Sequence, residues 1–299
     1  MTTTRPISKA RLWLGLLRPR TLFSSLSAVL VAIFYAARSG MPPVLESCLL
    51  IGVALGAQIS SNIANDLIDF KRGADTLERK GPLRPLSRGM LSERAVRRML
   101  LLFLGLTLAL GLWLIALSSW WLLTVALVVL LGVFAYSGAG ISLAYRGLGD
   151  VAVLIFFGIV PVVVGYYILE GTILDSTLWH LAFAIGLSNV NILVVNNYRD
   201  YAEDAQVGKR TLVVMMGRDF APRLYLSCGM LSMGLLYPIY SAWAMPLLLG
   251  YVLLFSSTYR SLQNNEGEQL NRTLAQTARN AFALSIMIGL MLLIRSLSA

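Results

Sequence analysis

The stretch SNIANDLIDFKRGAD, residues 61–75, is the part of this chain that indicates its architecture most directly. It leaves a long apolar run, enters a basic segment, and carries Asn62, Asn65, Asp66, Asp69 and Asp75. Asn62 and Asp66 are four residues apart, and Asp66 and Asp69 three, so on a helix they share one face. Ionisable side chains at a membrane boundary are costly and usually functional. The pattern therefore predicts a polar site at the end of an apolar helix.

A second stretch of the same kind, VVNNYRDYAEDAQVGKRT, occupies residues 194–211. Asn196, Asp200 and Asp204 are spaced four apart, which on one helix makes a polar stripe, and Asn197 stands three residues before Asp200. In both stretches Asn precedes Asp, and a basic residue, Gly and Thr follow. This weak internal repeat predicts two related halves around a central site.

The composition predicts a membrane protein, because 57% of the 299 residues are hydrophobic and only 13% are charged. Apolar runs of roughly 20 residues, the length that spans a bilayer, recur along the whole chain. We expect one all-α transmembrane domain, residues 1–299, with about nine helices around a central cavity. The expected spans are 21–38, 44–65, 98–117, 120–138, 149–169, 178–197, 222–242, 244–258 and 280–297.

The basic residues support this topology. If the N-terminus is cytoplasmic, all of the 25 Lys and Arg residues except Arg38 and Arg295 fall on the cytoplasmic side of the expected spans. The net charge of +10 therefore reflects membrane orientation, and the partner it implies is the lipid bilayer, with no role for nucleic acid. Both acid-bearing stretches then face the cytoplasm. The polar residues 259–279 are expected to form an amphipathic or loop element over the same face.

Two sets of carboxylates that face each other across a bundle would repel unless a cation lies between them. Oxygen ligands from Asp and Asn suit a hard ion, so Mg²⁺ is the expected cofactor. Mg²⁺ usually completes its coordination with substrate phosphates, and nearby basic side chains would bind the remaining phosphate charge. These are Lys71, Arg72, Arg199, Lys209 and Arg210. A membrane location and a diphosphate site suggest a substrate with a charged head and a lipid tail, as in polyprenyl diphosphates.

Two other classes of membrane protein also carry functional acids in or beside the membrane. A CDP-alcohol phosphotransferase also uses aspartates at the membrane edge, but its pattern of DG, AR and GxxxDxxxD is absent from the sequence. A secondary transporter also combines intramembrane acids with a repeat, but its acids are expected near the middle of the bilayer on broken helices. The acids of this chain are expected at the cytoplasmic ends of helices, which favours the enzyme.

The stretches NDLIDFKRGAD and NNYRDYAEDAQVGKRT resemble the two aspartate-rich motifs of the UbiA-type intramembrane prenyltransferases, and the likeness covers nearly the whole chain. It is strongest to the menaquinone branch of the family, through SNIAND, GPLR at 81–84, GLGDVAVLIFFG at 147–158 and GYY at 165–167. Family members often carry an acid where this chain has Gly73, and Asp75 is expected to replace it. RPLSRG at 84–89 is similar to the 4-hydroxybenzoate branch, which leaves that acceptor or another aromatic open.

The resemblance implies transfer of a polyprenyl group from polyprenyl diphosphate to 1,4-dihydroxy-2-naphthoate, with loss of CO₂ and diphosphate, in a bacterial cytoplasmic (inner) membrane. It implies metal ligation by Asn65, Asp66, Asp69, Asp75, Asp200 and Asp204. It implies diphosphate binding by Asn62, Asn65, Lys71, Arg84, Asn197, Arg199 and Lys209. The expected catalytic residues are Asp66, Asp69, Asp200 and Asp204, with Asp150 orienting or deprotonating the acceptor.

Overall fold

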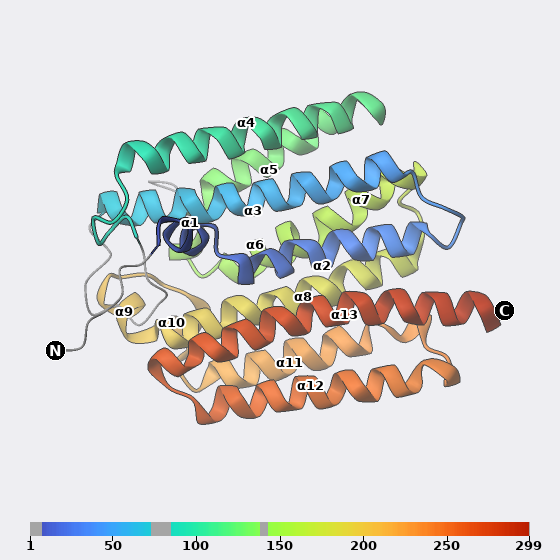
Figure 1. Cartoon of the computed structure of the whole chain (residues 1–299). Helices are drawn as coiled ribbons and strands as arrows, with labels where there is room; N and C mark the ends of the chain where they lie inside the picture. Colours follow the sequence, from blue (N-terminus) through green and yellow to red (C-terminus); the bar gives the residue numbers. More distant parts are fainter. Residues whose placement is uncertain (1–7, 73–84, 138–142, 299) are drawn as a thin grey trace.

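The computed structural model describes residues 8–72, 85–137 and 143–298, and within these ranges every regular element is helical (Figure 1). The α-helices are α1 (Lys9–Leu17), α2 (Pro19–Ala36), α3 (Val44–Arg72), α4 (Glu93–Leu117), α5 (Leu122–Ser137), α6 (Gly149–Leu154), α7 (Val160–Glu170), α8 (Ser176–Arg199), α9 (Tyr201–Gln206), α10 (Leu212–Met216), α11 (Phe220–Gly234), α12 (Met245–Asn264) and α13 (Leu270–Ser298). Shorter elements are the 3₁₀ turns η1 (Leu143–Tyr145), η3 (Tyr237–Ile239), η4 (Ala242–Ala244) and η5 (Gly267–Gln269), and the π-helix η2 (Ile155–Ile159). The predicted all-α class is confirmed.

Six helices of the described chain are long and apolar enough to cross a membrane. They are Val44–Ile68, Glu93–Leu117, Gly149–Glu170, Ser176–Arg199, Ala242–Asn264 and Gly267–Ser298. The α1–α2 pair, bent by 50°, makes a seventh if it is one span. Each range expected to span the membrane overlaps a helix, but α5 and α11 are shorter than the ~20 residues of a full crossing. The expectation of about nine crossings around a central cavity stays a prediction.

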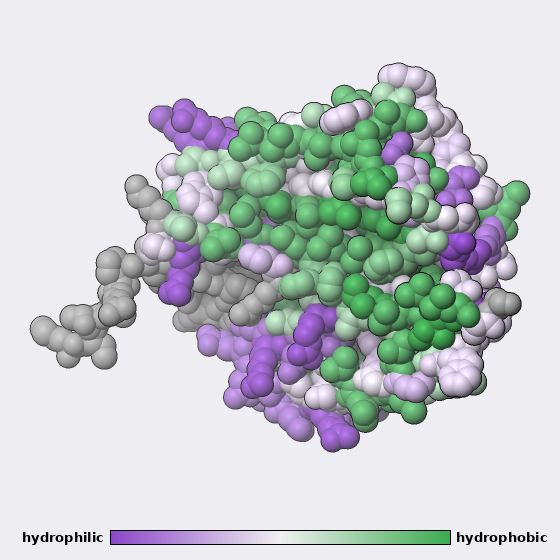
Figure 2. Space-filling model, turned by 45° about the vertical axis from the view of Figure 1, so that its right-hand side comes forward, coloured by the Kyte–Doolittle hydropathy of each residue, from purple (hydrophilic) through white to green (hydrophobic). Residues whose placement is uncertain are grey.

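The outer surface of the bundle suits lipid. Only 11% of the apolar window of α4 is buried, and its outward face is a run of exposed leucines. They are Leu101, Leu102, Leu104, Leu106, Leu108 and Leu112. Figure 2 shows the hydrophobic colour as a broad band over one side of the molecule, with hydrophilic residues toward the edges of the band. A face of this kind is stable only where water is excluded from it.

Helices α3 and α8, which carry the two acid-bearing stretches, end on the same side of the bundle, where α1, α9 and α10 also lie (Figure 1). Arg38, beyond the end of α2, and Arg295, near the end of α13, lie at the opposite end. There Arg38 pairs with Asp175, and Arg295 donates a hydrogen bond to the carbonyl of Pro238. The two polar stretches are therefore brought to one end, as the spacing of the spans predicts.

Two expectations about local structure are wrong. The stripe of Asn196, Asp200 and Asp204 is not on one helix, because α8 ends at Arg199 and α9 begins at Tyr201, with Asp200 between them. Residues 259–279 do not form a separate surface element, because they make up the end of α12, η5 and the start of α13.

The polar side chains of that segment pair the two helices. The Asn265 amide donates hydrogen bonds to Ser261 Oγ at 2.9 Å and to Thr273 Oγ1 at 3.0 Å. Small polar residues of this kind commonly hold membrane helices together through hydrogen bonds, which explains part of the polar composition.

Elements η2 and α8 pack backbone against backbone. A Cβ added to Gly158 would lie 2.3 Å from the Cα of Gly186, so the two backbones touch and neither position has room for a side chain. The π-helix turns the Phe157 carbonyl to the side chain of Asn189 on α8, which donates to it at 2.7 Å. A π-helix inside a membrane span leaves backbone groups that a neighbouring helix must satisfy, and Asn189 does so here.

Candidate active site

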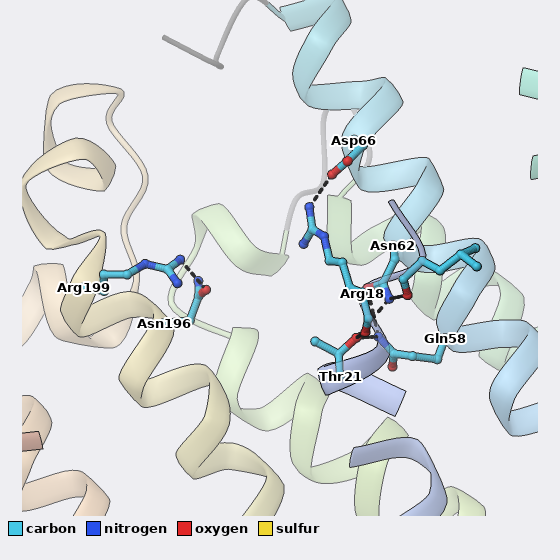
Figure 3. A network of polar contacts seen from close by, with 8 residues as sticks. Arg18, Thr21, Gln58, Asn62, Asp66, Asn196 and Arg199 are labelled. Atoms are coloured by element: carbon cyan, nitrogen blue, oxygen red, sulfur yellow. Dashed lines mark hydrogen bonds and ion pairs between the residues drawn. The ribbon is translucent and has the colours of Figure 1, made fainter. Parts of the chain in front are cut away.

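The first acid-bearing stretch forms the last turns of α3. Asp66 is only 2% exposed, and its carboxylate pairs with the guanidinium of Arg18, at the junction of α1 and α2 (Figure 3). A desolvated carboxylate is stable only beside a cation or when neutralised, and the Arg18 guanidinium supplies a cation at Asp66. One turn earlier, the Asn62 side chain donates to Leu17 O and to Thr21 Oγ1, both at 3.0 Å.

The second acid-bearing stretch begins at the end of α8. The Arg199 guanidinium donates to both carboxylate oxygens of Asp200, at 2.6 and 2.7 Å, and to Asn196 Oδ1 at 2.8 Å. It also donates to Asn271 Oδ1, at the start of α13, at 2.8 Å. Arg199 and Asp200 are 6% and 5% exposed, so this is a buried, bidentate ion pair. It ties the end of α8 to the last helix of the chain.

The next acid, Asp204 on α9, is paired with Lys209. The ammonium lies 3.0 Å from both carboxylate oxygens, and the Lys209 amide donates to the Asp204 carbonyl at 2.9 Å. Gly208, with φ of +70°, makes the turn that brings Lys209 back over α9. Burial raises the pKa of the Asp204 carboxyl above its ordinary value, and Lys209 acts in the opposite direction. A cation near Asp204 therefore controls how readily it ionises.

Asp150 lies at the start of α6 and is 7% exposed. Its Oδ1 is buried and has no hydrogen-bond partner among the described residues. The segment before it packs on the loop of the second acid-bearing stretch, since the Arg210 amide donates to Tyr145 O at 3.3 Å. A buried carboxylate oxygen without a partner is costly, so this position suits a residue that receives a hydrogen bond from a ligand.

The other predicted residues divide into three groups. Asn65 is half-buried on α3, and Asn197 is 2% exposed on α8. Lys71 is exposed, and its ammonium lies 3.9 Å from Glu93 on α4. Asp75, Arg84 and the side chain of Asp69 lie outside what the structure describes, so their roles stay predictions.

Several residues of this region were not predicted to belong to the site. Arg18 was counted only as a topology-determining charge. Thr21, Gln58 and Asn271 are ordinary polar residues in the sequence, and no pattern distinguishes them. The available signal is weak: Gln58, Asn62 and Asp66 are spaced four apart, so they lie on one face of α3.

The donor chemistry fits a hard divalent cation. Asp66, Asp200 and Asp204 are buried carboxylates, and each is next to a cationic side chain of the protein, which compensates the charge that a metal ion would compensate. Among the described side chains, no three His, Cys, Asp or Glu residues are grouped to hold a metal ion. The Asp69 side chain and Asp75 are outside that set, so the full ligand group is left to the proposal below.

Comparison with known proteins assigns the class of protein. A model of the UbiA prenyltransferase family matches residues 25–293, and the chain belongs to this family. The 1,4-dihydroxy-2-naphthoate octaprenyltransferase of Escherichia coli (strain K12) is 30% identical, over 96% of this chain and 97% of the relative. The enzyme of the same name from Haemophilus influenzae is 33% identical over the same shares. That from Bacillus subtilis (strain 168) is 32% identical, over 71% of this chain and 68% of the relative.

Solved structures show the same fold. A UbiA homologue from Archaeoglobus fulgidus, bound to GPP and Mg²⁺, has a TM-score of 0.64 at 19% identity and covers 95% of this chain and 99% of its own. The apo structure of a UbiA homologue from Aeropyrum pernix K1 has a TM-score of 0.67 at 17% identity, covering 92% and 97%. The resemblance inferred from the two acid-bearing stretches is confirmed at the level of the family.

Proposed function

We propose that this protein transfers a polyprenyl group from polyprenyl diphosphate to 1,4-dihydroxy-2-naphthoate, releasing CO₂ and diphosphate and forming demethylmenaquinol. The observation that carries the proposal is the pairing of two acid-bearing helix ends on one side of a family-typical bundle. Relatives named for this reaction, at 30% and 33% identity over nearly the whole chain, support the choice of acceptor.

Mg²⁺ bound between the two stretches would compensate the negative charge that grows on the leaving diphosphate. Its ligands would come from Asn65, Asp66, Asp69, Asp75, Asp200 and Asp204. Arg199 holds the Asp200 carboxylate in one orientation through its bidentate contact. Lys209 lies beside Asp204, and its ammonium would bind a phosphate oxygen. Lys71, Arg84 and Asn197 complete the proposed diphosphate contacts, and Asn62, whose amide donates to Leu17 O and Thr21 Oγ1, positions the residues around them.

The chemical step breaks the bond between the prenyl C1 and the diphosphate oxygen, and the diphosphate leaves with that electron pair. The electron-rich ring carbon of the acceptor attacks C1, forming the new carbon–carbon bond. The bond from that ring carbon to the carboxylate then breaks, CO₂ leaves, and the electron pair restores the aromatic ring. Holding both substrates in contact accounts for a large part of the rate enhancement.

Asp150 is proposed to orient the acceptor or to accept a proton from one of its hydroxyl groups. Its buried Oδ1, which has no partner among the described residues, is available to receive such a hydrogen bond. An apolar interior, which we propose is lined in part by Phe156 and Phe157, would keep water from the allylic cation.

The proposed location is a bacterial cytoplasmic membrane, with the N-terminus and both acid-bearing ends on the cytoplasmic side. The distribution of charge supports this orientation, because all Lys and Arg residues except Arg38 and Arg295 fall on the cytoplasmic side of the expected spans.

The test is a transfer assay on purified protein with a long-chain prenyl diphosphate, either acceptor, and Mg²⁺ or EDTA. We expect a Mg²⁺-dependent product from 1,4-dihydroxy-2-naphthoate whose mass reflects loss of CO₂. A product only from 4-hydroxybenzoate, with its carboxylate retained, would replace the proposed acceptor. Folded protein that transfers a prenyl group to neither acceptor would refute the proposal, and a secondary transporter would become the hypothesis to test next.

A further inference from the structure

We propose that Arg18 is a diphosphate-binding residue of this site, and that Asn62, Gln58 and Thr21 position it. The inference deepens the proposed function and rests on it. Neither the family match nor the two acid-bearing stretches points to Arg18, which precedes the matched residues 25–293.

The backbone at Arg18 is the first observation. Arg18 ends α1 and precedes α2, with φ of 49° and ψ of 65°, and within the described ranges it is the non-glycine residue with a positive φ. Residues that carry a side chain rarely adopt this left-handed backbone conformation, and glycine would adopt it at lower free-energy cost. Such outliers cluster at functional sites, where surrounding contacts enforce them. Glycine would fit this backbone better, so the presence of arginine indicates that its guanidinium has a function at this position.

The contacts that enforce the bend come from α3. The Asn62 side-chain amide donates hydrogen bonds to Leu17 O, just before Arg18, and to Thr21 Oγ1, three residues after it. The Oδ1 of Asn62 accepts a hydrogen bond from Gln58 Nε2 at 3.1 Å. Thr21 Oγ1 in turn donates to the Arg18 carbonyl at 2.9 Å. Both amide donors of Asn62 and its carbonyl are thus engaged by the protein, which makes Asn62 a positioning residue and not a direct ligand of the diphosphate.

Apolar packing fixes the same junction. Leu16, on α1, belongs to a buried cluster with Ile63 and Leu67, which flank the polar face of α3. The helix that ends at Arg18 is therefore docked on the helix that carries Asp66. The guanidinium is placed by its own backbone, by hydrogen bonds and by packing, as preorganised binding requires.

The guanidinium points into the site. It contacts Asp66, one turn beyond Asn62, and in Figure 3 it lies between Asp66 on α3 and the Asn196–Arg199 pair on α8. The Arg18 side chain is 25% exposed, whereas that of Arg199 is 2% exposed and is held by three side chains. The planar fork of a guanidinium matches the geometry of phosphate oxygens, and the Arg18 side chain is partly exposed beside Asp66, which suits contact with a diphosphate. Arg199 is committed to holding Asp200.

The competing explanation is a purely structural ion pair that fixes α1 to α3. The two explanations differ in what they predict for diphosphate binding. A structural pair affects stability alone, whereas a binding residue changes the affinity for diphosphate even in variants that fold normally. Binding of inorganic pyrophosphate to the purified full-length protein, measured by calorimetry in Mg²⁺, separates them without any transfer reaction.

We expect Arg18→Gln to weaken pyrophosphate binding at least tenfold and to raise the KM for prenyl diphosphate. Arg18→Lys, which keeps the charge but loses the planar fork, should give an intermediate affinity and serves as the second variant if Arg18→Gln folds poorly. Arg38→Gln is the matched control, because Arg38 also pairs with an aspartate but lies at the opposite end of the bundle. Its affinity should equal that of the unaltered protein.

Mg²⁺ alone gives a further readout. Arg18 competes with the proposed metal ion for the Asp66 carboxylate. Removing Arg18 should therefore not reduce the thermal stabilisation by Mg²⁺, while the affinity for pyrophosphate falls. Pyrophosphate affinity unchanged in both Arg18 variants overturns the inference and leaves the proposed function standing. No pyrophosphate binding by the unaltered protein overturns the proposed function, and this inference with it.

Discussion

Replacing Arg199 with leucine tests the electrostatic design of the site. The guanidinium makes two hydrogen bonds to Asp200 and one each to Asn196 and Asn271. Leucine removes all of them and leaves the Asp200 carboxylate, 5% exposed, without its cation. Breaking a buried ion pair from one side costs about 3–5 kcal/mol. We expect the free energy of unfolding, measured by denaturant titration in mild detergent, to fall by that amount.

Graded variants separate the contributions. Asn271→Ala removes one hydrogen bond to a charged group and should cost about 1.5–3 kcal/mol. Replacing both Arg199 and Asp200 with leucine removes the stranded charge, so most of the loss should be recovered. Arg97→Leu is the control, because its pair with Glu93 is exposed and contributes about 0.3–0.5 kcal/mol.

Mg²⁺ should distinguish a structural aspartate from a metal ligand. If Asp200 binds Mg²⁺, the ion replaces the charge that Arg199→Leu removes. Mg²⁺ at 100 times its Kd then adds about 2.7 kcal/mol of stability. A loss below about 1 kcal/mol for Arg199→Leu without Mg²⁺ would show that the buried-pair reasoning is wrong.

Three further predictions concern packing, ionisation and the metal. Gly158→Ala places a Cβ 2.3 Å from the α8 backbone and should cost about 1–3 kcal/mol in a thermal melt, whereas Gly105→Ala, with nothing within 4 Å, should leave the Tm unchanged. Lys209→Met removes the cation that lowers the pKa of Asp204, so this pKa should rise. The acid limb of the pH–activity profile should then move to higher pH, and an acid limb that does not move contradicts the role of Asp204. Asp66→Asn should abolish transfer while circular dichroism and gel filtration remain normal, because the amide lacks the charge that binds Mg²⁺.

The helices and the meeting of the two polar stretches could be predicted from the sequence. Long apolar runs predict membrane helices because a chain in the bilayer must satisfy its backbone hydrogen bonds internally, which a helix does within one segment. Since an even number of expected spans separates the two stretches, they must end on one side, and the ends of α3 and α8 that carry them do so.

Other features depend on contacts between helices, which no local pattern encodes. Arg18 followed by Pro19 reads as an ordinary helix start, and only the docking of α1 on α3 brings it to Asp66. The π-helix at 155–159 depends on the close approach of α8, which two separated glycines allow. The end of α8 at Arg199 coincides with side-chain contacts to Asn271, 72 residues later in the chain.

The pairing of the first and last long helices has a consequence for biosynthesis. Phe23 on α2 packs edge-on against Phe282 on α13, with ring centroids 5.2 Å apart, and Gly289 of α13 accommodates Phe34 of α2. Helix α13 leaves the ribosome after the other described helices, so α2 must wait in the membrane without this neighbour while every helix between them is inserted. Asn271, which completes the contacts of Arg199, arrives with α13. A chain that stops before α13 would thus lack the complete candidate site, which ties competence for the proposed chemistry to the synthesis of α13.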